Sequence, residues 1–168
     1  MGEPRIAIYP SSANPPTWGH ANILQRSVAC FDHIYWAAAY NPEKKYIFSA
    51  EERKQMMMEY VHHFQLTNVT IDMFSGSTVR YAQQKKAKVL IKGLRNESDF
   101  HAELQQFVGN KGIDSTIETF CLFGVPELSV VSSSLVRELA MLGENIESYV
   151  HPAVAKLVLQ ILKRSSTI

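Results

Sequence analysis

Short hydrophobic runs alternate along this chain with longer stretches in which hydrophobic residues recur every three or four positions. The short runs predict strands at residues 5–9, 34–39, 69–74, 88–92 and 116–123. The longer stretches predict helices at residues 19–31, 49–63, 77–86, 98–110 and 133–142, and a last helix that begins at Pro152. Ser49 and Glu52 have the spacing of a capping box, which supports a helix start at that point.

The regular exchange of strands and helices predicts an α/β fold. We expect a single domain over residues 1–168, with a five-stranded parallel sheet, helices on both faces, a C-terminal helix and a frayed tail at 164–168. The helix at 98–110 carries Phe100, Leu104, Phe107 and Val108 on one side, which we expect to face the core. Ligands of such sheets bind beyond the carboxyl ends of the strands, where the strand order reverses.

Composition and charge are those of an average globular protein, because 46% of the 168 residues are hydrophobic, 20% are charged and the net charge is +1. This balance argues against a general affinity for nucleic acid or for an anionic membrane. No run approaches the roughly 20 apolar residues that span a bilayer, and no signal peptide is recognisable. Cys30 and Cys121 form no CxxC pair; we expect both to be buried and the protein to be cytoplasmic.

Polar and charged residues gather where each predicted strand ends, in segments 10–20, 40–45, 75–78, 93–95 and 131–134. A parallel sheet brings these segments to one edge, so hydroxyl groups, an imidazole, Lys44, Lys92 and Arg95 are expected to meet there. Cationic side chains and the N-terminal ends of helices attract anions. The edge therefore suits a polyphosphate ligand.

The stretch Thr17-Trp18-Gly19-His20 is the most specific of these signals. It lies at a predicted helix start, where the helix dipole favours a neutral imidazole that can still donate one N–H to a phosphate oxygen. Gly19 allows close approach of the backbone to a ligand. The alternative is a histidine that only caps the helix and packs on the loop.

The other loop residues also have purely structural interpretations. The serines at 132–134 fit simple N-capping of the next helix, and Lys44 and Lys45 fit a solvated turn. Arg95 fits an ion pair with Asp99 at a helix start. The convergence of all these residues on one edge favours the anion-binding interpretation.

A resemblance to bacterial phosphopantetheine adenylyltransferases is carried by IAIYPSSANPPTWGH, FDHIYWAAAYNPEKKYIFSAEER, VLIKGLRNESDF and VVSSSLVRELA. The family is one of the nucleotidyltransferases marked by a [HT]-x-G-H sequence, and the resemblance runs collinearly from about residue 5 to residue 163. It implies a dinucleotide-binding-like fold and adenylyl transfer from ATP to 4′-phosphopantetheine, which yields dephospho-coenzyme A and pyrophosphate. It also implies Mg²⁺ as cofactor, a cytoplasmic homo-hexamer, and coenzyme A as a candidate inhibitor.

The resemblance further assigns individual residues. His20 corresponds to the histidine that stabilises the transition state at the α-phosphate, and Lys44 to the lysine that bridges the two reacting phosphates; these are the candidate catalytic residues. The candidate acceptor contacts are Ser12, Lys44, Thr78 and Lys92. The candidate ATP-binding residues are Ser12, Ala13, His20, Gly93, Leu94, Arg95, Glu103, Leu128, Ser129, Val130, Val131, Ser132, Ser133 and Ser134. No metal ligand is implied in the protein, because Mg²⁺ is held mainly by phosphates.

Several positions depart from the family pattern. Residues 11–15 read Ser-Ser-Ala-Asn-Pro where the family has G-[ST]-F-D-P, and Lys92 replaces an arginine. Ser77 and Thr78 replace residues that are typically apolar. Two alternatives therefore stay open: a related nucleotidyltransferase with another phosphate acceptor, and a non-catalytic protein that binds a nucleotide or coenzyme A.

Overall fold

The computed structural model describes residues 2–40 and 46–165, so the predicted site residue Lys44 lies outside the described residues, as do residues 166–168. The strands in the described part are β1 (Ile6–Ser11), β2 (His33–Tyr40), β3 (Val69–Ser75), β4 (Val89–Leu94) and β5 (Glu118–Phe123). The helices there are α1 (Trp18–Ser27), α2 (Ala50–His63), α3 (Thr78–Gln84), α4 (Glu97–Ile113), α5 (Ser133–Met141) and α6 (Pro152–Ser165), with a short 3₁₀ helix η1 (Pro126–Leu128).

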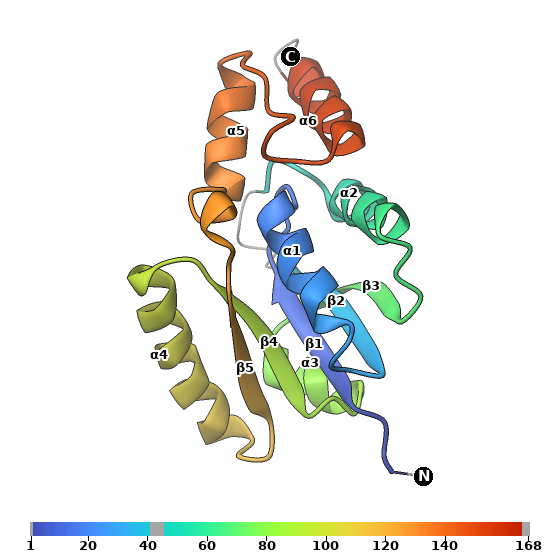
Figure 1. Ribbon diagram of the computed structural model, residues 1–168, viewed down its shortest axis with the longest axis vertical. Helices are drawn as coiled ribbons and strands as arrows, with labels where there is room; N and C mark the ends of the chain where they lie inside the picture. The colour runs from blue at the N-terminus through green and yellow to red at the C-terminus, as the bar shows by residue number, and fades with distance from the viewer. Residues whose placement is uncertain (1, 41–45, 166–168) are drawn as a thin grey trace.

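The strands form one parallel sheet in the order β3-β2-β1-β4-β5 (Figure 1). From β1 the chain builds outward through β2 to β3, and then it crosses back and places β4 against the other side of β1. The strand order therefore reverses between β1 and β4, which is where sheets of this kind open a crevice at their carboxyl ends. The predicted α/β fold with a five-stranded parallel sheet is confirmed.

Helices cover both faces of this sheet, as predicted. On one face, Tyr9 and Ile91 belong to a core shared with α1, α2, α5 and α6. On the opposite face, Ile8 and Leu90 pack with residues of α3. Because successive side chains of a strand point to opposite faces, Lys92 points to the same face as Leu90, and there it contacts α4. The helices α3 and α4 therefore share one face.

Local signals in the sequence account for most element boundaries. The capping box at α2 is present, because the Ser49 hydroxyl accepts from the Glu52 backbone N–H and the Glu52 carboxylate accepts from the Ser49 N–H. Helix α1 ends at Ser27, four residues earlier than predicted, and a turn follows in which the Cys30 N–H donates to the Ser27 carbonyl. Helix α6 includes residues 164 and 165 of the expected tail.

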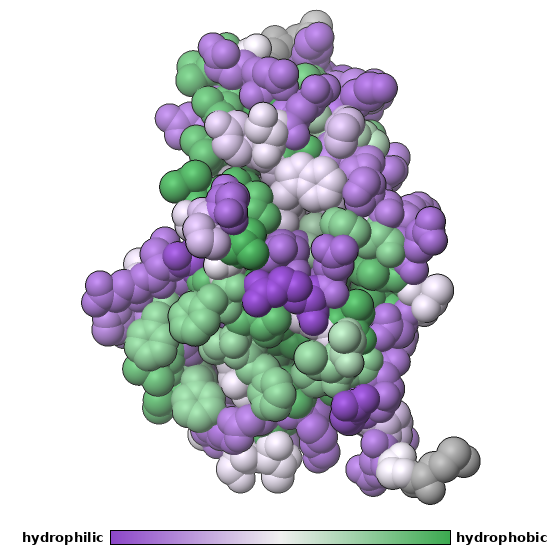
Figure 2. Space-filling model, in the orientation of Figure 1, coloured by the Kyte–Doolittle hydropathy of each residue, from purple (hydrophilic) through white to green (hydrophobic). Residues whose placement is uncertain are grey.

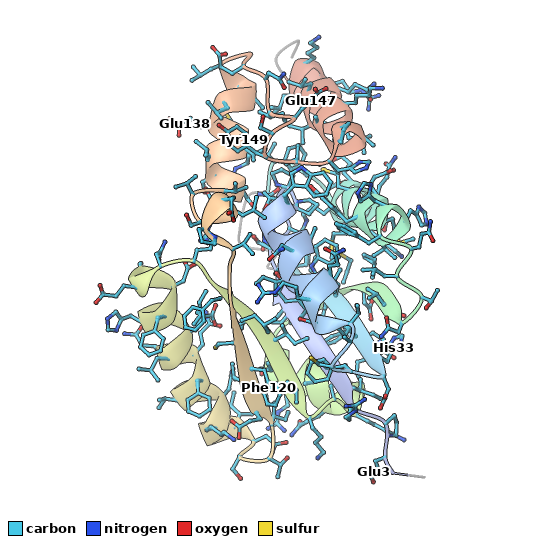
Figure 3. The ribbon with its side chains drawn as sticks, viewed as in Figure 1. Glu3, His33, Phe120, Glu138, Glu147 and Tyr149 are labelled. Atoms are coloured by element: carbon cyan, nitrogen blue, oxygen red, sulfur yellow. The ribbon has the colours of Figure 1, made fainter. Side chains whose placement is uncertain are left out.

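The hydrophobic side of α4 does not face the core, so that prediction is wrong. Phe100, Leu104 and Val108 are 48%, 46% and 63% exposed, and no residue of α4 is buried. The helix packs at the edge of the sheet beside β5, whose Phe120 and Phe123 are also exposed. Figure 3 shows Phe120 on this edge strand, and Figure 2 shows hydrophobic side chains gathered over α4 and β5. An amphipathic pattern marks a side that avoids water, but it does not say what covers that side.

The expectation of two buried cysteines is also wrong. Both thiols are free and exposed, because Cys30 lies in the turn after α1 and Cys121 lies on the edge strand β5. Among the helices that the structure describes, none combines the length and hydrophobicity needed to cross a membrane.

Candidate functional site

A pocket of about 340 Å³ opens at the carboxyl ends of β1 and β4, where the strand order reverses. Ligand sites in proteins commonly have volumes of roughly 300–1,000 Å³. The first turn of α1, the first turn of α5 and the start of α4 complete its wall. The lining residues are Tyr9, Pro10, Ser11, Ser12, Thr17, Gly19, His20, Asn22, Ile23, Lys92, Gly93, Leu94, Arg95, Asp99, Glu103, Gly124, Val125, Leu128, Val131, Ser132, Ser133 and Ser134.

Gly93 lets α1 approach β4 closely at the floor of this pocket. A Cβ atom at position 93 would lie 2.9 Å from Cγ1 of Ile23, which is closer than such contacts occur. The absence of a side chain at position 93 therefore lets Ile23, in the middle of α1, lie directly against β4.

His20 lies in the first turn of α1 and has a defined orientation. Its Nδ1 accepts a hydrogen bond from the Thr17 backbone N–H at 3.2 Å and lies 2.9 Å from the Thr17 hydroxyl. An Nδ1 atom that accepts leaves the proton of the neutral ring on Nε2, which is then the donor. Burial, with a smaller contribution from the positive charge of Arg95, lowers the pKa of His20 to about 4. The predicted neutral imidazole at a helix start is thus supported, and the ring also completes a capping box with Thr17.

Arg95 follows β4 and forms a two-pronged ion pair with Asp99 in the first turn of α4. The Nε and Nη2 atoms of Arg95 lie 2.8 Å and 3.0 Å from the two carboxylate oxygens of Asp99. Nη1 donates to the Val131 carbonyl at 3.1 Å, which ties β4 to the segment before α5. The hydrogen bonds from Arg95 lower the pKa of Asp99. The ion pair considered from the sequence is present, and both partners line the pocket.

Lys92, near the end of β4, has a similar counter-ion. Its Nζ lies 2.6 Å from Oε2 of Glu103 and donates to Oε1 of Gln106 at 2.9 Å, both on α4. Tyr9 lines the pocket from β1, and burial raises the pKa of its hydroxyl group. The charge of Arg95 lowers the pKa of this hydroxyl and the charge of Glu103 raises it, both by less than burial does. The floor therefore holds two cations, each held in place by a carboxylate on α4.

The three serines before and within α5 have hydroxyl groups that are already engaged. The Ser132 hydroxyl accepts from the Leu135 N–H and caps α5, which confirms the capping interpretation for this residue. The Ser133 hydroxyl donates to the Pro15 carbonyl at 2.7 Å, and the Ser134 hydroxyl accepts from Arg137 at 3.2 Å. Backbone N–H groups at the start of a helix attract anions independently of these side chains.

The structure brings most of the sequence-predicted site residues together. The candidates that line the pocket are Ser12, His20, Lys92, Gly93, Leu94, Arg95, Glu103, Leu128, Val131, Ser132, Ser133 and Ser134. It places four candidates outside the lining, namely Ala13, Thr78, Ser129 and Val130. The segment 75–78 after β3 therefore does not reach this pocket, and η1 intervenes between β5 and the serines.

Other lining residues were not identified from the sequence. Tyr9 and Asn22 carry polar groups at the pocket wall, and Asp99 had been interpreted only as a partner for Arg95. Tyr9 was the most accessible to prediction, because it lies two residues before the end of β1, directly before the loop that carried the motif. With two helix N-terminal ends, two arranged cations and a neutral imidazole donor, the pocket suits a chain of phosphate groups.

Comparisons with known proteins agree with this geometry. Residues 8–139 match the model of the cytidylyltransferase-like family. Phosphopantetheine adenylyltransferase of Synechococcus elongatus is 43% identical over 149 residues, which are 89% of this chain and 89% of that protein. The protein of the same name from Caldanaerobacter subterraneus is 38% identical over 161 residues, 96% of this chain and 99% of that one. The fold is also similar to Plasmodium falciparum nicotinic acid mononucleotide adenylyltransferase, at 13% identity and a TM-score of 0.67, over 98% and 96% of the two chains.

The lowered pKa of His20 predicts a loss of stability in weak acid. The unfolded chain binds a proton at this ring near the ordinary pKa of 6.5, whereas the folded chain does so only near 4. The contribution of His20 to the free energy of unfolding is therefore complete above about pH 6.5 and falls as the pH approaches 4. We expect His20→Gln, which cannot titrate, to lose less stability than the wild type between pH 7.5 and 4.5 in urea denaturation. Equal losses in the two proteins would contradict the assignment; His151, whose pKa is also lowered, is present in both.

Proposed function

Because the chain belongs to the phosphopantetheine adenylyltransferase family, we propose that it transfers the adenylyl group of ATP to 4′-phosphopantetheine. The products are dephospho-coenzyme A and pyrophosphate, as in coenzyme A biosynthesis. The observation that carries this proposal is one pocket in which His20, Lys92, Arg95 and the N-terminal end of α5 meet at the strand-order reversal. The relatives that bear this activity in their name match over most of the chain.

The reaction needs no covalent intermediate on the protein. A phosphate oxygen of phosphopantetheine attacks the α-phosphorus of ATP in line, a new P–O bond forms, and the bond between the α-phosphorus and the bridging oxygen breaks. The electron pair of that bond leaves with pyrophosphate. Transfers of this type are accelerated mainly by positioning and by stabilisation of charge. The Nε2–H of His20 supplies a donor toward the α-phosphoryl oxygens, and the neutral ring adds no charge that would have to be neutralised.

The two cations of the pocket have different tasks in this proposal. Arg95, which is held by Asp99 and the Val131 carbonyl, lies beside the start of α5 and binds the outer phosphates of ATP. Lys92 collects the phosphate of the acceptor and offsets its repulsion from ATP. Because Lys92 is paired with Glu103, acceptor binding replaces or shares that contact. Lys44 stays a prediction as the bridge between the reacting phosphates.

Mg²⁺ enters this scheme as part of the substrate. Among the described residues, no group of three histidine, cysteine, aspartate or glutamate side chains is placed to hold a metal ion. The pocket carboxylates Asp99 and Glu103 are both engaged with cations. We therefore propose that the ion arrives as MgATP with phosphate oxygens among its ligands, and that it offsets their charge.

The acceptor is tested directly by turnover. We expect pyrophosphate release from MgATP with 4′-phosphopantetheine, and no comparable release with nicotinate mononucleotide or a sugar-alcohol phosphate as acceptor. Release only with one of the other phosphates would favour the related nucleotidyltransferase. Calorimetric binding of ATP without turnover of any acceptor would favour the non-catalytic nucleotide-binding alternative.

Loss of the imidazole donor should slow the chemical step. Removal of one preorganised donor to a developing charge typically lowers kcat by about 10²–10³. We expect His20→Ala to show a loss of this size in steady-state assays of pyrophosphate release, with KM for ATP changed less. A variant with near-normal kcat would remove His20 from this role.

The proposed reaction also implies inhibition by coenzyme A and a location in the cytoplasm. Coenzyme A differs from the product by one phosphate, so it fits the product site and would inhibit by competition. The free thiols of Cys30 and Cys121 suit the reducing environment of the cytoplasm, where we place the protein.

We also propose that the chain forms a homo-hexamer and that the hydrophobic face on α4 and β5 contributes to its contacts. Exposed hydrophobic patches of this kind mark interaction surfaces, and this one includes Phe100, Leu104, Val108, Phe120 and Phe123 (Figure 2). A charged side chain placed there would lose its water on assembly, which would destabilise the contact.

We expect Val108→Lys and Phe123→Lys to lower the mass measured by light scattering from that of a hexamer toward the 19.0 kDa of one chain. Met141→Lys is the matched control, since Met141 is 59% exposed but lies at the end of α5. A wild-type protein of monomer mass would contradict the proposal, and so would dissociation caused by the control alone.

A further inference from the structure

Arg53 of α2 is a fully buried cation close to the pocket but not part of its lining. Its exposed fraction is 0%. Nη1 donates to the Ser12 carbonyl at 2.8 Å and to the Ala39 carbonyl at 3.0 Å, and the guanidinium carbon lies 4.2 Å from the centre of the Tyr46 ring. Ser12 directly follows β1 and Ala39 is near the end of β2. One side chain therefore joins the carboxyl ends of two adjacent strands.

Stability alone does not account for this arrangement. Within the described part of the chain, the Nε and Nη2 atoms of Arg53 are buried without a hydrogen-bond partner. Burial lowers the pKa of the guanidinium group, which reflects the cost of keeping its charge out of water. Buried charges with unsatisfied donors are costly, and hydrophobic residues of similar size are often at least as stabilising in their place. A cation at such a position points to a function.

The contact of Arg53 is one of several that hold the carbonyl groups of the first loop. Beyond Ser12, the carbonyl of Asn14 accepts from Arg137, that of Pro15 from Ser133, and that of Pro16 from the Tyr60 hydroxyl. Carbonyl oxygens carry negative partial charge and would repel a phosphate. Side chains from α2 and α5 thus engage the oxygens of the loop that reaches the pocket at Ser12.

The residue after Ser12 has an uncommon backbone conformation. Ala13 has a φ of 45°, in the left-handed region that residues other than glycine rarely adopt. In a trans peptide the carbonyl and the following N–H point in opposite directions. With the Ser12 oxygen held toward Arg53, the Ala13 N–H points away from Arg53, and it makes no hydrogen bond to another described residue.

We propose that Arg53 is a positioning residue for adenylyl transfer: it orients the Ser12–Ala13 peptide so that the carbonyl oxygen faces away from the phosphates. The Ser12 hydroxyl then remains on the side of the ligand. This inference rests on the proposed function, in which Ser12 contacts both substrates. Arg53 itself touches neither substrate, because it lies behind the pocket wall.

Three variants test the proposal, with KM and kcat, melting temperature and amide hydrogen exchange as readouts. For Arg53→Met we expect a melting temperature close to that of the wild type, at least tenfold faster exchange in residues 12–14, and a kcat lowered by about 10-fold to 100-fold. A displacement of about 1 Å at a reacting group can have an effect of this size. Each KM should change by less than kcat. Arg53→Lys keeps a donor for the two carbonyls and should recover part of both losses.

Arg5→Met is the matched control. Arg5 pairs with Asp32 at 3.1 Å and so joins the opposite, amino ends of the same two strands at an exposed position. We expect its kcat and the exchange of residues 12–14 to equal those of the wild type.

Wild-type kcat and wild-type exchange in Arg53→Met would overturn the proposal. A melting temperature that falls in step with activity, with no rescue by Arg53→Lys, would overturn it as well and make Arg53 structural only. A wild-type protein that fails to turn over 4′-phosphopantetheine would instead refute the proposed acceptor. In that case the exchange of residues 12–14 still tests the orienting role, because it needs no substrate.

Discussion

The pairing of β1 with β4 is the contact on which the site depends. These strands are far apart in sequence, and the register of Ala7 with Val89 and Ile8 with Leu90 sets their ends side by side. Each strand then delivers one part of the pocket: β1 leads into the loop and helix that carry His20, and β4 carries Lys92 and Gly93 near its end and is followed by Arg95. If the strand order continued in one direction, β4 would not lie beside β1. The two groups of residues would then not face a common crevice.

The charges of the pocket are balanced before any ligand binds. Arg95 is matched by Asp99 and Lys92 by Glu103, so the resting site contains two ion pairs rather than two free cations. The two carboxylates, which belong to α4, fix the position of each cation and reduce the repulsion between the cations. The positive ends of the capped helices α1 and α5 add a fixed attraction for anions. In the proposed reaction, recognition of the phosphates depends on exchanging contacts within these ion pairs.

The sequence was sufficient for the order and type of the elements, because the sheet is parallel and its strands are nearly continuous hydrophobic runs separated by amphipathic helices. It was also sufficient to group His20, Arg95 and the serines, because all follow strand ends. It failed where a residue has two possible environments. The hydrophobic side of α4 was assigned to the core, although Phe100 and Val108 are exposed. Thr78, which the resemblance assigns to the acceptor, follows β3, the far edge strand two positions from β1, and does not line the pocket; its acceptor role stays a prediction. Strand order, which follows from long-range pairing, sets the position of both segments.

The departures of the first loop have a structural explanation that keeps the site intact. Asn14 stands where the family has a carboxylate, and its side chain is 9% exposed, with Oδ1 accepting the Phe48 N–H at 3.4 Å. An amide oxygen performs this task as a carboxylate oxygen does, and it avoids burying a charge close to the proposed phosphate site. Ala13 lies fully buried behind Ser12, so its small side chain leaves the pocket lining to Ser12. The loop is therefore held in position by its carbonyl groups, which every residue type provides. This allows its side chains to differ from the family pattern while the edge that we propose to bind phosphates keeps its shape.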